Sequence, residues 1–438
     1  MHTGTNLPKV GSFNRSVVLS AIQVSDGISR VQIAARTGLT PQTVSVIVRR
    51  LMAEGLVVAD GSAPSGGGKP RTILRVDPAA GYAIGVHFDP GEIAYVLADL
   101  AGRPVARHRA AVPAGRAPGD VIDEMAGTVR RLAADAGVPP GRVLGAGLAC
   151  PGPLDADGVM SAPPRLPGWD GVPVRRLLQE RTGVPVTCDN DATAAAVGER
   201  WAGRARGVPA FAYLYLGTGI GGGLFLADQV YRGRSGNAGE FGHITVLPDG
   251  PECYCGNRGC VEAVCRPEAI EAAVRDRLAA APAPDAPQAV PPATPQTGRH
   301  TASRTESRAK SRTGSRNAPA TTLRGAPGHA EICAAAAAGD PLARAVVGEA
   351  AARVADAAVG IVNLLDIDLL ILGGPALREV AGVYHEAVSR AVATRPLARR
   401  LHQVRVELSQ VEDAAAIGAA SLVFHAAYAP RLGTLLSP

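Results

Sequence analysis

The chain has 438 residues, of which 46% are apolar and only 4% aromatic, and its net charge is +6. This length exceeds that of one typical domain, and the apolar fraction supports sizeable cores made of small side chains. The seven cysteines, an odd number, argue against a disulfide framework. No run of eighteen apolar residues could span a membrane, and the start of the chain lacks the apolar core of a signal peptide. We therefore predict a cytoplasmic protein.

Positive charge is concentrated in two segments of the chain. Residues 1–77 hold nine Lys and Arg against four Asp and Glu, and residues 281–328 hold seven against two. A basic N-terminal block is typical of proteins that bind nucleic acid, although ordinary surface charge gives the same count.

Residues 14–53 have the pattern of a helix-turn-helix. Ser29 can cap one helix that stops at Gly38, and Thr40 can cap the next helix, with Pro41 in its first position. The second helix has an apolar stripe to bury and an opposite face that can meet a major groove. The stripe comprises Val44, Ile47, Val48 and Leu51, and the candidate DNA contacts are Gln42, Thr43, Ser45 and Arg49.

Two β-like runs, residues 56–59 and 72–76, then flank a Gly-rich tip that carries Lys69 and Arg71. This is the pattern of a wing, a hairpin whose basic tip can reach phosphates or the minor groove. The alternative is a three-helix packing module that does not touch DNA. Because helix-turn-helix, wing and basic charge agree, we predict a DNA-binding domain over residues 1–77.

Residues 80–280 and 329–430 alternate β-like apolar runs with Ala-rich helical runs, which is typical of an α/β domain. Residues 281–328, between them, contain eight prolines, many Ser, Thr and Arg, and almost no large apolar side chains. Such a segment cannot bury enough surface to fold alone, so we predict a disordered insertion. A basic arm for DNA is the alternative.

A second cluster of unusual residues lies between Gly239 and Ala263. Its three cysteines and one histidine, His243, Cys253, Cys255 and Cys260, make a Cys3His set that suits tetrahedral zinc. Four protein ligands leave no open position, so we predict a structural zinc, with reduced thiols on a loop as the alternative.

Polar side chains that could bind hydroxyls surround this cluster in the sequence. Glu240 and Glu262 bracket it, while Asn190 and Asp191 follow an apolar strand and precede an Ala-rich helix. Ligands bind at strand ends of α/β folds, and these side chains donate to or accept from hydroxyls. Together with His243 they either bind a polyol or serve separate structural roles.

Several motifs of this chain resemble those of the ROK family (repressors, open reading frames and sugar kinases). They are "DNDATAAAVGE", "LGTGIGGGLFL", "GNAGEFGH" and "CYCGNRGCVEA", with residues 148–174 fitting as well. The resemblance runs from Tyr82 to about Tyr428 without the insertion. The combination of Glu-x-Gly-His with Cys-x-Cys-x4-Cys is highly specific.

The resemblance implies an actin-like, hexokinase-type body of two α/β lobes, here 80–190 and 191–430, with a sugar in the cleft. It implies sugar contacts from Asn190, Asp191, Glu240, His243 and Glu262. His243 would bind zinc through one ring nitrogen and face the sugar with the other. Asp191 stands at the position of the family's catalytic base. Arg165 stands where the family often has asparagine, which could favour an anionic sugar, but we interpret it as a surface arginine.

The ATP site of the family is matched only in part. Residues 217–223, "GTGIGGG", match the second phosphate loop. The first loop of the family kinases, Asp-x-Gly-Gly-Thr, is replaced: His87 stands for the aspartate, Asp89 and Pro90 for the glycines, and Gly91 for the threonine. Asp89 repels phosphate and Pro90 has no N–H to donate, so we expect neither ATP binding nor kinase activity.

We therefore predict a sugar-responsive transcriptional regulator, a repressor that binds operator DNA as a homodimer through its winged helix. Sugar would close the two lobes and move the two DNA-binding heads out of register. One alternative is a bifunctional ATP-dependent sugar kinase, similar to a glucokinase, with a DNA-binding head. Another is a sensor controlled by a protein partner or by zinc.

Overall fold

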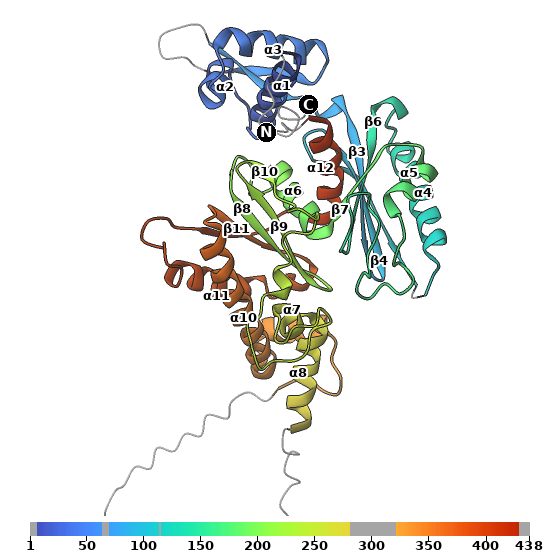
Figure 1. Ribbon diagram of the computed structural model, residues 1–438, viewed down its shortest axis with the longest axis vertical. Coiled ribbons are helices and arrows are strands. Elements are labelled where there is room, and N and C mark those ends of the chain that lie inside the picture. Colours follow the sequence, from blue (N-terminus) through green and yellow to red (C-terminus); the bar gives the residue numbers. More distant parts are fainter. Residues whose placement is uncertain (1–6, 64–69, 114, 281–320, 429–438) are drawn as a thin grey trace, which may run out of the picture.

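The computed structural model describes residues 7–63, 70–113, 115–280 and 321–428. It shows a small N-terminal head on a body of two α/β lobes, with the N-terminal lobe centred on β3 and β4 and the C-terminal lobe on β8 and β11 (Figure 1). This is the predicted fold class.

The head consists of three helices and a two-stranded hairpin. Its elements are α1 (Leu7–Gln23), α2 (Arg30–Thr37), α3 (Pro41–Ala53), β1 (Val57–Ala63) and β2 (Arg71–Val76). Ser29 caps α2 by accepting from the backbone N–H of Gln32, and Gly38 ends it with a φ of 69°. Thr40 caps α3 by accepting from the N–H of Thr43 at 3.2 Å. The predicted caps and the four predicted buried positions of α3 are confirmed.

The head shares its hydrophobic core with the body. One continuous cluster of buried side chains joins Ile33 and Leu51 of the head to Trp201, Ile417 and Phe424 of the body. The rings of Trp201 and Phe424 stack with centroids 5.6 Å apart. Because apolar surface is buried across this junction, the head is held against the body by packing as well as by the connecting chain.

Each lobe contains a five-stranded mixed sheet, and the two sheets have the same topology. The order is β5-β4-β3-β6-β7 in the N-terminal lobe and β10-β9-β8-β11-β12 in the C-terminal lobe. In both sheets, three antiparallel strands are followed by two parallel ones. The first sheet contains β3 (Tyr82–Asp89), β4 (Glu92–Asp99), β5 (Pro104–Ala111), β6 (Val143–Cys150) and β7 (Val186–Asn190). The second contains β8 (Phe211–Leu216), β9 (Ile220–Leu226), β10 (Gln229–Val230), β11 (Leu369–Gly373) and β12 (Arg405–Leu408).

Two helices cross between the lobes and pack on each other. Helix α6 (Asp191–Ala202) follows β7 and packs mainly on β8 and β9, whereas α12 (Ala414–Tyr428) follows β12 and packs on β3, β4 and β6. Their backbones approach so closely that a Cβ at Gly418 would lie 1.8 Å from the carbonyl oxygen of Ala194. The predicted assignment of all of 191–430 to the second lobe is therefore wrong for α12, because this helix buries its side chains against the first sheet.

The remaining helices pack against the two sheets or against one another. They are α4 (Pro118–Asp135) and α5 (Val174–Thr182) on the N-terminal lobe, and α7 (Val261–Cys265), α8 (Pro267–Ala280), α9 (His329–Ala337), α10 (Pro341–Leu365) and α11 (Ala381–Thr394) on the C-terminal lobe. Within the described residues, no helix combines the length and the apolar character that a membrane crossing requires.

The end of the predicted insertion differs from the structure. Residues 281–320 lie outside the described residues, but residues 321–328 are packed against the C-terminal lobe. Leu323 is buried, and the hydroxyl of Thr321 donates to the carboxylate of Asp340 at 2.8 Å. The predicted boundary at 328 is therefore eight residues too late, because one apolar side chain and one helix-capping aspartate anchor this stretch.

Replacing residues 281–320 with a short Gly-Ser bridge is expected to leave the Tm within about 2 °C of the wild-type value, because closure entropy changes slowly with loop length. Extending the deletion to 328 is expected to lower the Tm further, because burial of Leu323 and the bonds to Asp340 are lost. Thermal melts of the two variants measure the difference. Equal Tm values would show that residues 321–328 contribute nothing.

Candidate functional site

A cavity of about 460 Å³ lies between the two lobes, beside the start of α6. We call it the interlobe cavity. The structure brings all five predicted polar residues to its wall, although they are spread over more than seventy positions of the chain. The wall includes Asn190, Asp191, Glu240, His243 and Glu262, together with Arg165, Thr218, Asn237 and Tyr254.

Asn190 and Asp191 reach the cavity because they stand at the junction of β7 and α6. The side-chain oxygen of Asn190 caps α6 by accepting from the N–H of Ala192 at 3.0 Å, which leaves its amide NH2 as the group available to a ligand. Burial, together with the neighbouring carboxylates of Asp89, Glu240 and Glu262, raises the pKa of Asp191 to about 7. Asp191 is therefore poised to exchange a proton near neutral pH.

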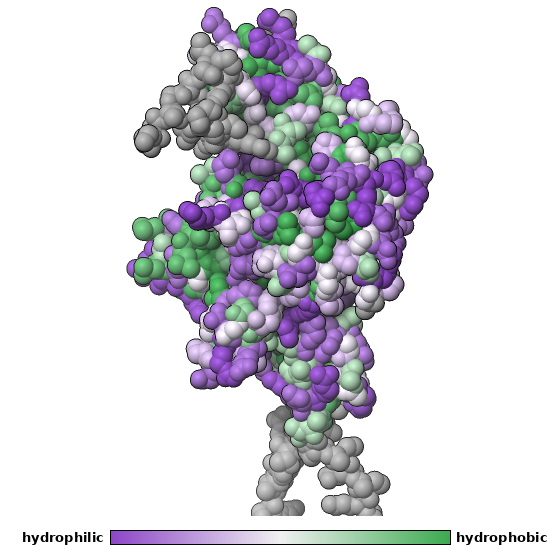
Figure 2. All heavy atoms as spheres, turned by 45° about the vertical axis from the view of Figure 1, so that its right-hand side comes forward, coloured by the Kyte–Doolittle hydropathy of each residue, from purple (hydrophilic) through white to green (hydrophobic). Residues whose placement is uncertain are grey.

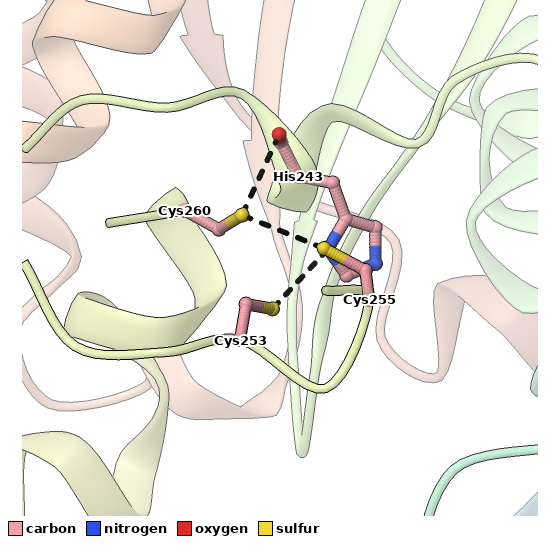
Figure 3. Close-up of side chains that lie close together, drawn as sticks. All are labelled: His243, Cys253, Cys255 and Cys260. Atoms are coloured by element: carbon pink, nitrogen blue, oxygen red, sulfur yellow. Dashed lines mark hydrogen bonds between the residues drawn. The ribbon is translucent and has the colours of Figure 1, made fainter. Parts of the chain in front are cut away.

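The predicted metal ligands meet at one point on the C-terminal lobe (Figure 3). The ligand atoms of His243, Cys253, Cys255 and Cys260 all lie within 4.8 Å of one another. The sulfurs of Cys255 and Cys260 are 3.7 Å apart, and Cys253 Sγ lies 3.6 Å from His243 Nδ1. A tetrahedral zinc ion with ordinary bond lengths requires about 3.8 Å and about 3.6 Å for these two separations. The cluster can therefore hold a metal ion, and its geometry is compatible with structural zinc.

The two nitrogens of the His243 ring face different groups. Nδ1 is directed toward the thiols, whereas Nε2 lies 3.1 Å from the hydroxyl of Tyr254 and 3.9 Å from a carboxylate oxygen of Glu240. The ring thus lies between the metal cluster and the interlobe cavity. Glu262 is held from the other side, because one of its oxygens accepts from the N–H of Ile220 at 2.7 Å.

Sequence reasoning missed two residues of the cavity and misjudged a third. Tyr254 stands between two of the cysteines, and Asn237 exchanges two hydrogen bonds of 2.9 Å with the backbone of Leu154 in the other lobe. Asn237 lies in the motif "GNAGEFGH" and Tyr254 in "CYCGNRGCVEA", so their places in these motifs could have identified them from the sequence. Arg165 is not simply a surface arginine, because it lines the cavity and donates across it to the carbonyl of Thr218.

A second cavity, of about 420 Å³, lies next to the first, on the side where the resemblance places ATP. Here the two loops that would hold phosphates bond to each other: the Thr218 hydroxyl donates to Asp89 at 2.9 Å. Burial raises the pKa of Asp89 and lowers that of His87 to about 4, so this histidine is neutral at pH 7. Asp89 and the neutral His87 provide no positive charge for a phosphate, whereas Arg109 and Arg378 line other parts of the same cavity.

The predicted DNA-facing side of the head is exposed. On α3, the side chains of Gln42 and Arg49 are exposed, whereas the hydroxyls of Thr43 and Ser45 are bonded locally, to Thr40 Oγ1 and the Pro41 carbonyl. Arg71 is exposed at the start of β2, and Lys69 lies outside the described residues. Gln42 and Arg49 are therefore the best placed of the predicted contacts on α3.

Comparison with known proteins matches both parts of the chain. A model described as "ROK family" matches residues 83–426, and one described as "Winged helix-turn-helix DNA-binding" matches residues 16–58. The xylose repressor of Bacillus subtilis (strain 168) is 33% identical over 256 residues, which are 58% of this chain and 65% of that protein. Matches to this and three further proteins named as xylose repressors, one of them a putative assignment, span 62–65% of their length, less than two thirds.

Two solved structures show the same fold. A ROK family transcriptional regulator, described as a homolog of the E. coli MLC protein, matches 98% of both chains with a TM-score of 0.73 at 22% identity. A ROK glucokinase from Streptomyces griseus, solved with glucose and AMPPNP, matches 78% of this chain and 99% of its own, with a TM-score of 0.60 at 26% identity.

Proposed function

Because the chain belongs to the ROK family, we propose that it is a sugar-responsive transcriptional repressor that acts in the cytoplasm. The observation that carries this proposal is the presence of two sites in one chain: a cavity between the lobes that is lined by carboxylates, and an exposed helix on a winged-helix head. The relatives named as xylose repressors support it.

The interlobe cavity is the proposed sugar site. Asp191, Glu240 and Glu262 present carboxylate oxygens that accept from sugar hydroxyls, and the amide of Asn190 donates. Tyr254, with its hydroxyl beside His243, supplies an aromatic ring at the same wall. Relatives named as glucokinases and xylose repressors support a pentose or hexose as the ligand.

Zinc is the proposed occupant of the Cys3His cluster. Three thiolates and the Nδ1 of His243 would fill its four positions, so the ion would have a structural role. A bound zinc ion would cross-link the loop that carries Glu240 and Glu262. The residues themselves then perform the recognition: His243 keeps Nε2 toward the cavity, and the two carboxylates approach it from opposite ends of that loop.

We also propose that the repressor acts as a homodimer on a palindromic operator, because one winged helix reads a single half-site. Apolar surface is present at the edge of the C-terminal lobe, on the side of α11 (Figure 2). In the same lobe, Leu364 near the end of α10 and the two leucines that follow α11, Leu397 and Leu401, are 81%, 90% and 92% exposed. Such exposed apolar side chains support an interface with another protein chain.

A kinase with a DNA-binding head is the alternative. The Gly-rich turn before β9 and a carboxyl group with a pKa of about 7 at Asp191 favour it, because a base near neutrality can remove a sugar hydroxyl proton. The bond between Asp89 and Thr218 opposes it, because it links the two loops where phosphates would be held. Formation of ADP from ATP and D-glucose or D-xylose would favour the kinase.

The proposal is tested with an operator selected by the purified protein from random duplexes. D-xylose, D-glucose and D-mannose are added to the complex, and the Kd for DNA is measured by gel shift. A sugar that raises the Kd at least about fivefold supports the proposal, since coupling between two sites is typically of this size or larger. DNA binding unaffected by every sugar, at concentrations that saturate the protein in calorimetry, contradicts it.

Replacing Arg49 with alanine is expected to weaken operator binding by about ten- to a hundredfold, because a lost contact from an arginine to a base edge is worth about 1–3 kcal/mol. The loss of affinity should depend on the operator sequence. Arg71→Ala, by contrast, should weaken binding to all duplexes alike. If Arg71 contacts phosphate, this variant should also reduce the slope of log Kd against log salt concentration by about one. Arg176→Ala, an exposed position on α5 of the N-terminal lobe, is the control. Full operator affinity in Arg49→Ala would remove α3 from the interface.

A further inference from the structure

Helix α6 connects the interlobe cavity with the head. Its first residue, Asp191, lines the cavity, and its penultimate residue, Trp201, belongs to the core that the head and the body share. A helix of 12 residues spans about 18 Å at 1.5 Å per residue. The two sites of the protein are therefore joined by one uninterrupted element.

The end of α6 is bonded directly to the head. The side-chain amide of Gln23, the last residue of α1, donates to the carbonyl oxygen of Trp201 at 2.8 Å, and both residues are more than 90% buried. The Trp201 ring stacks on Phe424, and its Nε1–H donates to the Leu100 carbonyl at 3.2 Å. A displacement of this end of α6 therefore acts on α1 and on the core beneath it.

Helix α6 is packed too closely to bend independently of its neighbour. Nine of its residues are buried, and a Cβ at Gly198 would lie 3.0 Å from the Ala414 carbonyl oxygen of α12. A Cβ at Gly418 would lie 1.8 Å from the Ala194 carbonyl oxygen of α6. Close-packed helices of this kind shift as units, because local bending would create overlaps or voids.

We propose that Gln23 is the positioning residue through which the sugar site controls the head, with α6 as the rigid connection. The inference rests on the proposed function and extends it to the route of regulation. A ligand that draws Asn190 and Asp191 toward Glu240 and Glu262 displaces the start of α6. The displacement reaches Trp201, and the bond from Gln23 transfers it to α1 and thereby to the orientation of α3.

The bond can be removed without leaving a buried group unsatisfied. The Trp201 carbonyl also accepts from Nε of Arg206 at 3.0 Å, so it keeps a partner when Gln23 is replaced. Methionine has the length of glutamine and no donor, so Gln23→Met preserves the packing of the junction. Asp26→Asn is the matched control, because Asp26 makes an exposed ion pair with Arg206 at the same junction, 3.3 Å long.

The measured quantity is the ratio of operator Kd values with and without the panel sugar that releases DNA most strongly from the wild type. In Gln23→Met this ratio is expected to fall at least about fivefold, with sugar affinity in the absence of DNA unchanged within about twofold. Asp26→Asn is expected to keep the wild-type ratio. An unchanged ratio in Gln23→Met, or an equal fall in both variants, overturns the role of Gln23.

A second readout follows the helix itself. The chain has two tryptophans, so Trp169→Phe leaves Trp201 as the only one. The same sugar is expected to change the emission of Trp201 in this background, with or without Gln23→Met, because α6 still moves. No change in emission overturns α6 as the connection. Sugar that binds but does not release wild-type DNA contradicts the proposed function, whereas equal release from wild type and Gln23→Met contradicts the inference alone.

Discussion

Replacing Cys255 with serine is expected to abolish stoichiometric zinc binding and to weaken sugar binding by about a hundredfold. Cys255 is exposed, so the substitution disturbs no apolar packing and removes one of four ligands. Without the ion, the loop that carries Glu240 and Glu262 loses its cross-link. The hydrogen bonds that both carboxylates make to the sugar, worth about 1.5–3 kcal/mol each, are then weakened together, which gives a loss of this size. Elemental analysis measures the zinc, and calorimetry measures the sugar affinity.

The control for this variant is Glu240→Ala, which removes a carboxylate at the cavity and no metal ligand. It is expected to retain zinc while binding sugar more weakly. Operator affinity without sugar should be close to the wild-type value in both variants, because the Cys3His cluster is not part of the core shared with the head. A Cys255→Ser protein that lacks zinc and binds sugar normally would refute the structural role of the metal.

Replacing Asp191 with asparagine is expected to weaken sugar binding by about ten- to a hundredfold and to stabilise the fold above pH 7. A hydrogen bond to a charged acceptor is worth about 1.5–3 kcal/mol, which gives the loss of affinity. The gain in stability arises because the folded protein holds this carboxylate in a buried site near Asp89, Glu240 and Glu262. Asparagine removes the charge and keeps the shape.

The sign of the pH effect follows from the raised pKa. Asp191 has a pKa of about 7 in the folded protein and about 3.9 when unfolded, so between these values only the folded state holds the proton. Wild-type stability therefore declines as the pH rises from about 4 to about 7, by about 2–4 kcal/mol from this group. The Tm advantage of Asp191→Asn should appear at pH 8 and vanish at pH 4. The exposed Asp276→Asn is the control, and an equal advantage at both pH values would contradict the assignment.

Much of the head could be predicted from the sequence because its structure depends on local rules. Ser29, Gly38 and Thr40 mark the helix ends through caps and a left-handed residue, which involve only neighbours along the chain. The metal ligands could also be predicted, because three of them share one short loop. The zinc itself and the roles of the cavity residues remain proposals, although the structure brings those residues together.

What could not be predicted depends on contacts between distant segments. Arg165 reaches Thr218 across the cleft, and Asn237 bonds to Leu154, pairs separated by 53 and 83 positions in the chain. The position of α12 on the first sheet likewise depends on its crossing with α6. Hydrophobic periodicity within one segment does not predict how two distant helices cross. The packing of residues 321–328 depends on Asp340, which a composition count over the insertion does not consider.

The hydrogen bond between Asp89 and Thr218 bears on which concentrations in the cell control the response of this protein. If the two loops bind each other instead of a nucleotide, the response does not depend on the ratio of ATP to ADP. A sugar that is bound and then released without being phosphorylated is not used up by the protein that responds to it. Occupancy then follows the free concentration of the sugar reversibly, and the protein can return to its starting state as soon as that concentration falls.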